Sequence, residues 1–236
     1  MTFSIIYRAY AGETEGNLSR FRPSWFSKFN CWRSFWDEFG NISDIKISVL
    51  WDGECNGTFY DYIKSFGVEI IGFGKIGNKG GLLKTYKLLK ETDTQIVATV
   101  EDDYLILPEC LDTIQEGFSY GFLIYTPYEH QDRYFQPSRD ISWGKEEIYK
   151  GTKCYHRSVE STTGTCFFKK TTFDKVYDKL VYYNINDRPF FRDCYQNGIR
   201  IYSPMPGYAT HVCIDNNINL MSPFINWEKF NSTIKL

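Results

Sequence analysis

The amino-acid sequence predicts an α/β domain in which a mostly parallel central sheet is flanked by helices. Two patterns support this fold class. Short apolar segments alternate with helical patterns of about ten residues, which is typical of βαβ units. Polar and charged residues recur directly after these apolar segments, and ligands gather at the carboxyl ends of parallel strands. The length of 236 residues suits one domain over 1–236.

Strands and helices alternate through the first half of the chain. Strands are expected at 3–8, 45–51, 68–73, 95–100 and 121–126. Helices are expected at 24–39, 58–66, 78–91 and 110–117. The first of these helices carries aromatic residues at spacings of three and four, which predicts a buried face.

The second half of the chain is less regular. A long polar loop or lid is expected at 129–153. It is followed by a turn and strand at 161–169, helices at 171–182 and 186–197, and a short strand at 199–203. We find no internal repeat in the sequence.

The composition is that of a globular protein with many aromatic residues. Aromatic residues make up 18% of the chain, which argues against disorder because so much aromatic surface can close a core. The formal net charge of −2 gives no support for a general nucleic-acid binder. We expect no membrane span, since no segment approaches the ~18 apolar residues that one requires.

Seven cysteines are scattered along the chain without a CxxC pair. This odd, unpatterned set argues against a disulfide framework and against a structural zinc site. Buried free thiols in a reducing compartment are the simpler interpretation. The N-terminal segment lacks a cleavage-site pattern and is typical of a strand, so we expect a cytoplasmic protein.

The strongest chemical signal is the acidic run Glu101-Asp102-Asp103, which follows the apolar segment IVATV. Adjacent carboxylates beside an apolar strand are costly unless their charge is compensated. A divalent cation such as Mg²⁺ or Mn²⁺ is the usual compensation, because both ions prefer oxygen ligands. In an extended segment, residues i and i+2 share a face, so Glu101 and Asp103 are expected on the side opposite Asp102.

The sequence resembles the glycosyltransferases of the GT-A fold, which use nucleotide sugars. The resemblance rests, in order, on SIIYRAY, ISVLWDG, the turn GNKGG opening a helix, IVATV followed by EDD, and a late histidine in PGYATH. It implies a GT-A-like, Rossmann-type sandwich. In this fold 1–126 would bind the nucleotide sugar, and 127–236 would form the acceptor side and a C-terminal tail.

The acidic run is similar to the DXD motif of that family. The resemblance implies that Asp103 binds the divalent metal and that Asp102 contacts the ribose or the sugar. Glu101 would support them, although Asp is more usual at its position. His211 would complete the metal shell. A hydrogen-bonded structural histidine is the alternative interpretation of this residue.

Residues at other strand ends complete the expected donor site. Arg8 and Lys79 would add positive charge near the phosphates. The alternative interpretation, that both are solvated surface residues, explains their presence equally well. Tyr10 is suited to stack on the base, and Asp52 stands where members of the family contact the base. Asn78 belongs to the glycine-rich turn, which permits close approach of backbone to ligand. This turn is not a Walker motif, because the pattern GxxxxGK[ST] is absent. No GxGxxG fingerprint follows the first strand, which disfavours a dinucleotide oxidoreductase.

An inverting transferase requires a base that accepts the proton of the acceptor hydroxyl. Related enzymes place an acid at the start of a helix in the second half, and NINDRPFFRDC puts Asp187 there, with Asp193 six residues on. Asp187 is equally explained as an acid favoured by the helix dipole, and a retaining mechanism needs no such base. The turn 161–164 (STTG) and Trp143 have the residue types that contact acceptor sugars.

The sequence therefore predicts a metal-dependent hexosyl or pentosyl transferase. It would move a sugar from a nucleotide diphosphate sugar, such as a UDP-sugar, to an acceptor hydroxyl, with Mn²⁺ or Mg²⁺ as cofactor. The acceptor (glycan, glycoprotein or modified DNA base) and the oligomeric state stay open. A composition rich in Asn, Lys, Ile, Tyr and Phe suits a phage, a large virus or an AT-rich bacterium. A Mg²⁺-dependent nucleotidyltransferase and a non-catalytic sugar-binding domain stay open as alternatives.

Overall fold

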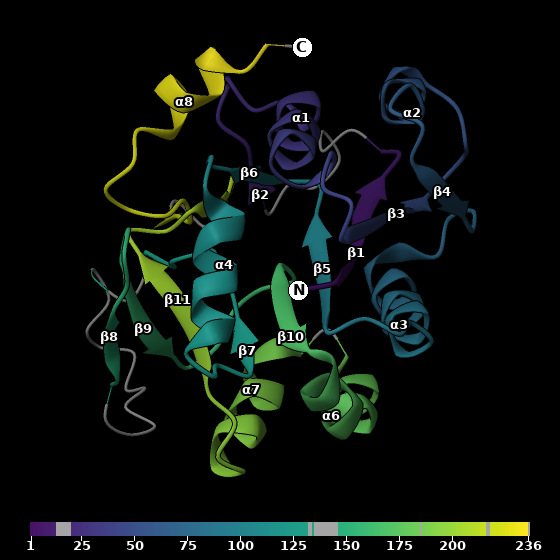
Figure 1. Cartoon of the computed structure of the whole chain (residues 1–236). Coiled ribbons are helices and arrows are strands. Elements are labelled where there is room, and N and C mark those ends of the chain that lie inside the picture. Colours follow the sequence, from purple (N-terminus) through teal and green to yellow (C-terminus); the bar gives the residue numbers. More distant parts are fainter. Residues whose placement is uncertain (13–19, 132–133, 135–145, 185, 216–217, 236) are drawn as a thin grey trace.

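A nine-stranded sheet forms the centre of the protein (Figure 1). The computed structural model describes residues 1–12, 20–131, 134, 146–184, 186–215 and 218–235. In spatial order the strands are β4 (Glu69–Gly72), β3 (Ile45–Asp52), β1 (Phe3–Tyr10), β5 (Ile96–Glu101), β10 (Cys166–Lys169), β7 (Ile124–Tyr125), β11 (Ile201–Met205), β9 (Tyr155–Val159) and β8 (Ile148–Lys150).

Seven of the nine strands run in one direction, and only β10 and β9 run against them. The parallel ladders align Arg8 of β1 with Glu101 of β5, and Tyr10 of β1 with Asp52 of β3. The predicted mostly parallel sheet is confirmed. The carboxyl ends of β1, β3 and β5 therefore meet at one edge.

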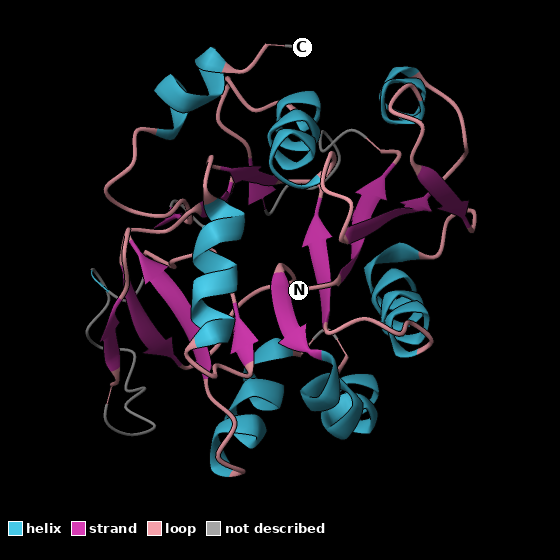
Figure 2. Ribbon diagram, in the orientation of Figure 1, coloured by secondary structure: helices cyan, strands magenta, loops and turns pink. Residues whose placement is uncertain are grey.

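Helices cover both faces of the sheet (Figure 2). On one face lie α1 (Lys28–Phe39), α2 (Thr58–Lys64) and α4 (Cys110–Ser119). On the other lie α3 (Gly77–Lys90), α6 (Lys170–Tyr183) and α7 (Asp187–Gln196). Alternation along β1 supplies both cores, because Ile5 packs on the first set and Ile6 on the second. None of the helices within the described ranges is long and apolar enough to cross a membrane.

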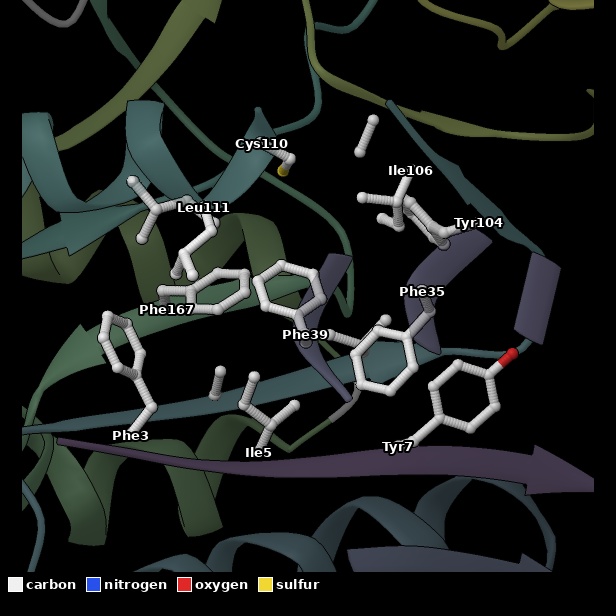
Figure 3. Packing of buried hydrophobic residues seen from close by; sticks show 14 of the residues in the cluster. Phe3, Ile5, Tyr7, Phe35, Phe39, Tyr104, Ile106, Cys110, Leu111 and Phe167 are labelled. Atoms are coloured by element: carbon white, nitrogen blue, oxygen red, sulfur yellow. The ribbon is translucent and has the colours of Figure 1, made fainter. Parts of the chain in front are cut away.

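Much of the aromatic content lies in the core between α1 and the sheet. Trp32, Phe35 and Phe39 of α1 are fully buried, and Tyr7 of β1 packs against Trp32 with ring centroids 4.9 Å apart. Figure 3 shows Phe35 and Phe39 lying over the side chains of β1. The expected aromatic face of this helix is therefore confirmed.

The first helix begins four residues later than the sequence pattern predicts. Ser27 caps α1, because its hydroxyl accepts a hydrogen bond from the backbone N–H of Asn30 at 3.4 Å. The backbone N–H of Phe26 donates to the carbonyl of Pro23 at 2.9 Å, so the segment before the cap forms a turn. This turn brings Arg22 and Lys28 toward the carboxyl ends of the strands.

Short strands outside the main sheet fix the segment that follows the acidic run. The two-stranded pair of β6 (Tyr104–Ile106) and β12 (Ala209–His211) places His211 opposite Tyr104. A second small sheet combines β2 (Arg20–Phe21), β13 (Ile214–Asp215) and β14 (Ile218–Asn219). The helix α8 (Trp227–Thr233) packs its Trp227 against Cys31 of α1.

Candidate active site

The acids predicted from sequence lie where β5 ends, next to the end of β1. Glu101 is the last residue of β5, and its carboxylate pairs with the Arg8 guanidinium at 2.9 Å. Arg8 also donates to the side-chain oxygen of Asn78 at 2.5 Å, which ties β1 to the start of α3. A Cβ added at Gly164 would collide with the Glu101 carboxylate, so the turn 161–164 crosses this group closely. Arg8, Asn78 and Glu101 thus form one connected group.

Asp102 is held at the end of β1 by two donors. Its Oδ2 accepts from the backbone N–H of Tyr10 at 2.9 Å and pairs with the Lys28 ammonium at 2.9 Å. Lys28 also donates to the carbonyls of Tyr10 at 2.8 Å and Gly12 at 3.1 Å. The Tyr10 ring is partly exposed beside this ammonium, with 5.4 Å between the nitrogen and the ring centroid.

Asp103 is buried and points to a different set of partners. Its Oδ2 accepts from Arg22 at 2.6 Å and from Nε2 of His211 at 3.0 Å. Burial alone would raise the pKa of Asp103, but the charges and hydrogen bonds of His211 and Arg22 outweigh it and hold that pKa well below its usual range. Among the described residues, the other oxygen, Oδ1, is buried without a hydrogen-bond partner.

His211 reaches Asp103 because β12 pairs with β6. Its ring stacks on that of Tyr104, with centroids 5.2 Å apart and an interplanar angle of 6°. The backbone N–H of Val212 donates to the Asp103 carbonyl at 2.9 Å, which fixes the two segments together. Two residues 108 positions apart in the sequence are therefore hydrogen-bonded.

The remaining donor-side residues lie around α3. Asp52 accepts from the backbone N–H of Ile76 at 2.7 Å, so its carboxylate holds the loop that leads into α3. Gly77, the first residue of this helix, has a φ of +69°, which favours glycine. Lys79 lies in the first turn of α3, and its side chain is exposed.

Asp187 and Asp193 lie on α7 in different surroundings. Asp187 begins the helix and is exposed, and desolvation of its carboxyl group raises its pKa. The charges of Arg188 and His130 act in the opposite direction and lower the pKa of Asp187. Asp193 pairs with Lys179 of α6 at 2.5 Å, so its contact lies between α6 and α7.

The expected acceptor-side turn lies next to the acidic run. The backbone N–H of Glu101 donates to the Thr165 hydroxyl at 3.2 Å, and the hydroxyls of Tyr104 and Thr163 are hydrogen-bonded. Thr162 donates to Thr126 at 2.9 Å. Trp143, the other residue expected here, lies outside the described residues.

The sequence pattern did not indicate the two cations that pair with Asp102 and Asp103. Arg22 and Lys28 do not stand at strand ends, because they come from the segment before α1 and from its first residue. The signal available in the sequence was a basic residue on each side of the predicted helix start at residue 24, namely Arg22 and Lys28. With Arg8, these cations give each acid of the run its own positive partner.

The residues at Asp103 fit a divalent cation. The buried Oδ1 of Asp103 has no partner among the described residues, and a carboxylate oxygen is the ligand type that Mn²⁺ and Mg²⁺ prefer. The neighbouring His211 imidazole would add one nitrogen ligand. Arg22 already binds the other oxygen, and its second guanidinium nitrogen donates to the carbonyl of Val212. A cation held by Asp103 would thus have Arg22 as a direct neighbour.

Neither a protein-family model nor a curated protein matches the chain. Solved structures share its fold. S. aureus TarS has a TM-score of 0.51 and 14% identity, over 86% of this chain and 35% of that one. TarS 1–349 in complex with UDP-GlcNAc has a TM-score of 0.51 and 13% identity, over 86% and 56%.

A third similar structure matches over nearly its whole length. It is CMP:2-keto-3-deoxy-manno-octonic acid synthetase complexed with CTP, with a TM-score of 0.50 and 12% identity, over 99% of this chain and 98% of that one. The present chain therefore spans about a third of TarS and nearly all of the synthetase. At these identities the likeness shows the fold alone. It confirms the predicted GT-A-like α/β class, and structures of this fold hold UDP-GlcNAc and CTP.

Proposed function

We propose that the protein is a glycosyltransferase that moves a sugar from a nucleotide diphosphate sugar to an acceptor hydroxyl with the help of a divalent cation. The observation that carries this proposal is the Asp103–His211 pair beside Asp102 at the carboxyl ends of β1 and β5. A buried carboxylate oxygen without a partner among the described residues supports a cation at this position. The match to a structure that contains UDP-GlcNAc supports a UDP-sugar as donor.

In this proposal Asp103 and His211 hold Mn²⁺ or Mg²⁺, which when bound neutralises charge on the leaving diphosphate. Arg8 and Lys79 add positive charge for the phosphates, and Tyr10 offers its exposed ring to the base. Asp52 positions the loop before α3, because it accepts from the N–H of Ile76.

The acidic run presents little net charge to an anionic donor. Each of its acids has a cationic partner, in Arg8, Lys28 or Arg22. A diphosphate would be repelled by three free carboxylates, whereas a neutralised cluster admits it. Asp102 would then exchange its ion pair with Lys28 for a hydroxyl of the ribose or sugar, which leaves Lys28 free for the phosphates.

Asp187 is the proposed general base, which accepts the proton of the acceptor hydroxyl. A raised pKa favours this role, because a base with a pKa closer to the working pH accepts a proton more readily than an ordinary Asp. Asp193 is the second candidate from the sequence, and it would have to leave Lys179 to act. The turn 161–164 beside Glu101 is the proposed start of the acceptor side, for a glycan, glycoprotein or modified DNA base.

A nucleotidyltransferase is the second candidate. The specific observation in its favour is the match with the CTP-bound synthetase over 99% of this chain. Both activities bring a nucleotide to the same strand ends. They differ in the phosphate product, since a glycosyltransferase releases a nucleoside diphosphate and a nucleotidyltransferase releases pyrophosphate.

The test incubates the protein with a panel of nucleotide sugars and Mn²⁺ or Mg²⁺, with and without EDTA, and measures nucleoside diphosphate. Parallel reactions contain nucleoside triphosphates with sugar acids or sugar phosphates, and pyrophosphate is measured. We expect metal-dependent release of UDP and none of pyrophosphate. Pyrophosphate release would establish the second candidate instead, and absence of nucleotide-sugar binding in calorimetry would refute the proposal.

Two variants assign the reaction to the site. Asp103→Asn keeps the shape of the side chain and should abolish metal-dependent donor binding. Asp37→Asn is the matched control, because this Asp lies on the exposed face of α1 in an ion pair with Arg33. Equal activity of Asp103→Asn and wild type would show that Asp103 binds no catalytic cation.

A further inference from the structure

A second group of metal-binding side chains lies away from the acidic run, between α4 and the hairpin of β8 and β9. It consists of Glu116 on α4, Cys154 in the turn before β9, and His156 on β9. One ligand atom of each residue lies within 4.8 Å of the others. His156 is fully buried and Cys154 is 6% exposed, whereas the Glu116 side chain reaches the surface.

The spacing of the ligand atoms is close to that around a tetrahedral ion. Nε2 of His156 lies 3.0 Å from Oε2 of Glu116 and 3.9 Å from Sγ of Cys154. Tetrahedral zinc bonds imply nitrogen–oxygen and nitrogen–sulfur separations of about 3.3 Å and about 3.5 Å, respectively. Shifts of a few tenths of an ångström would therefore bring these two pairs to coordination geometry, and the third pair, Sγ of Cys154 and the Glu116 ligand oxygen, is within 4.8 Å.

The second atoms of these ligands are already bound, which directs the first ones into the cluster. Nδ1 of His156 is hydrogen-bonded to the Tyr125 hydroxyl at 2.9 Å, an arrangement that fixes the ring when Nε2 binds a metal. Oε1 of Glu116 accepts from both the backbone N–H and the hydroxyl of Thr152 at 2.8 Å. Nε2 and Oε2 are left facing one another.

The surrounding chain encloses the cluster closely at Gly151. A Cβ added at this residue would lie 2.7 Å from Nε2 of His156 and would collide with the Glu116 carboxylate. Glu116 also lines an open hollow together with Met1, Asp112, Gln115 and Ser119, so one of the three ligands is in contact with solvent.

We infer that Glu116, Cys154 and His156 form a zinc site that joins α4 to the β8–β9 hairpin. A thiolate, an imidazole and one carboxylate favour zinc over Mg²⁺ or Mn²⁺, which prefer all-oxygen shells. The fourth position would be taken by water. The site shares no residue with the acidic run, so it does not depend on the proposed transferase activity.

This zinc site would stabilise the edge of the sheet. The residues of β8 are exposed, and the strand pairs only with β9 in the described sheet. An ion that bonds to Cys154 and His156 on the hairpin and to Glu116 on α4 fixes this edge strand to a buried helix. The scattered cysteine spacing argues against a zinc site built from cysteine pairs. It does not bear on this site, because two of the three ligands here are not cysteines.

A hydrogen-bonded cluster without metal is the competing interpretation. In that case Nε2–H of His156 donates to Glu116, the Tyr125 hydroxyl donates to Nδ1, and Cys154 is only a packed thiol. The two interpretations differ in zinc affinity and in the spectrum with Co²⁺. Only the metal site gives a thiolate-to-cobalt charge-transfer band.

The test titrates the metal-free protein with Zn²⁺ against a competing chelator, and records the absorption spectrum with Co²⁺. We expect one zinc per chain that resists the chelator, a thiolate–cobalt band and a higher melting temperature with zinc; any ion at Asp103 has no thiolate ligand and gives no such band. Cys154→Ser should remove the band, and Glu116→Gln should lower zinc affinity at least tenfold. Glu116→Gln can keep its contact with Thr152, so it preserves the fold if Cys154→Ser does not.

Two control variants make the result specific. Cys194→Ser changes another buried cysteine, on α7, and should leave the band and the zinc affinity unchanged. Asp103→Asn should also keep both, which separates this site from the catalytic cation. Wild type without stoichiometric zinc binding, or Cys154→Ser with an unchanged band and affinity, would overturn the inference.

Discussion

Replacement of Arg22 by alanine should destabilise the protein and expose its cation site at the same time. The Arg22 and Asp103 side chains are 12% and 11% exposed, and their charged atoms are 2.6 Å apart. Removal of one partner from a buried ion pair typically costs about 3–5 kcal/mol, because the other charge stays buried. His211 remains on the same oxygen, so we expect a cost of about 2–3 kcal/mol in the free energy of unfolding.

This cost converts into a measurable change in melting temperature. For a chain of 150–250 residues each kcal/mol corresponds to about 2–4 °C, so the melting temperature of Arg22→Ala should fall by about 4–12 °C. The matched control is Arg33→Ala, which breaks an exposed i,i+4 pair with Asp37 and should cost about 0.3–0.5 kcal/mol. Thermal unfolding followed by circular dichroism measures both.

Manganese should restore much of the loss in Arg22→Ala. Without the guanidinium, both oxygens of Asp103 and the nearby His211 can bind the ion, and binding at 100 times the dissociation constant adds about 2.7 kcal/mol. In the wild type we expect Mn²⁺ alone to have a smaller effect, since Arg22 occupies one oxygen. Equal shifts with Mn²⁺ in both proteins, or a melting temperature unchanged by Arg22→Ala, would refute this reasoning.

Three further predictions concern other parts of the molecule. Asp187→Ala should lower kcat at least 100-fold while donor binding in calorimetry is retained, and weakened donor binding would instead assign Asp187 to the donor site. In the wild type, kcat/KM should fall at low pH with a midpoint above the ordinary Asp pKa of about 3.9, because the base is inactive when protonated. Gly164→Ala should reduce turnover about tenfold or more, because its Cβ collides with the Glu101 carboxylate, and wild-type kinetics would contradict this close approach. Phe35→Ala should cost about 3–5 kcal/mol in denaturant unfolding, since Phe35 is fully buried, and a cost below about 1 kcal/mol would show that the core collapses around the gap.

The predictable part of the site is the part built from strand ends. Arg8, Asp52 and Glu101 end apolar segments, and parallel pairing brings such residues to one edge whatever the loops do. The meeting of Asp103 with His211 depends on the β6–β12 pair, which has only three residues in each strand. That contact was expected from a family resemblance, because no periodicity in the chain indicates it.

The cations were not predictable in the same way. Arg22 reaches Asp103 because the segment before α1 turns at Pro23 and because Ser27 caps the helix. The zinc ligands are a related case. Glu116 and His156 are 40 residues apart, and their approach depends on a tight crossing at Gly151. Contacts of this kind come from tertiary packing, which leaves no regular spacing in a sequence.

The two proposed metal positions should differ in what they do for the fold. At the acidic run the protein supplies its own positive charges, so the strand ends are compensated before any ion binds. An ion added there acts on a ligand's phosphates and contributes little to folding. At Glu116, Cys154 and His156 the nearby charge is not balanced by a lysine or arginine contact to Glu116 among the described residues, and the ligands join elements that are distant in sequence. An ion at this second position therefore stabilises the hairpin directly, because binding requires the folded arrangement of all three ligands.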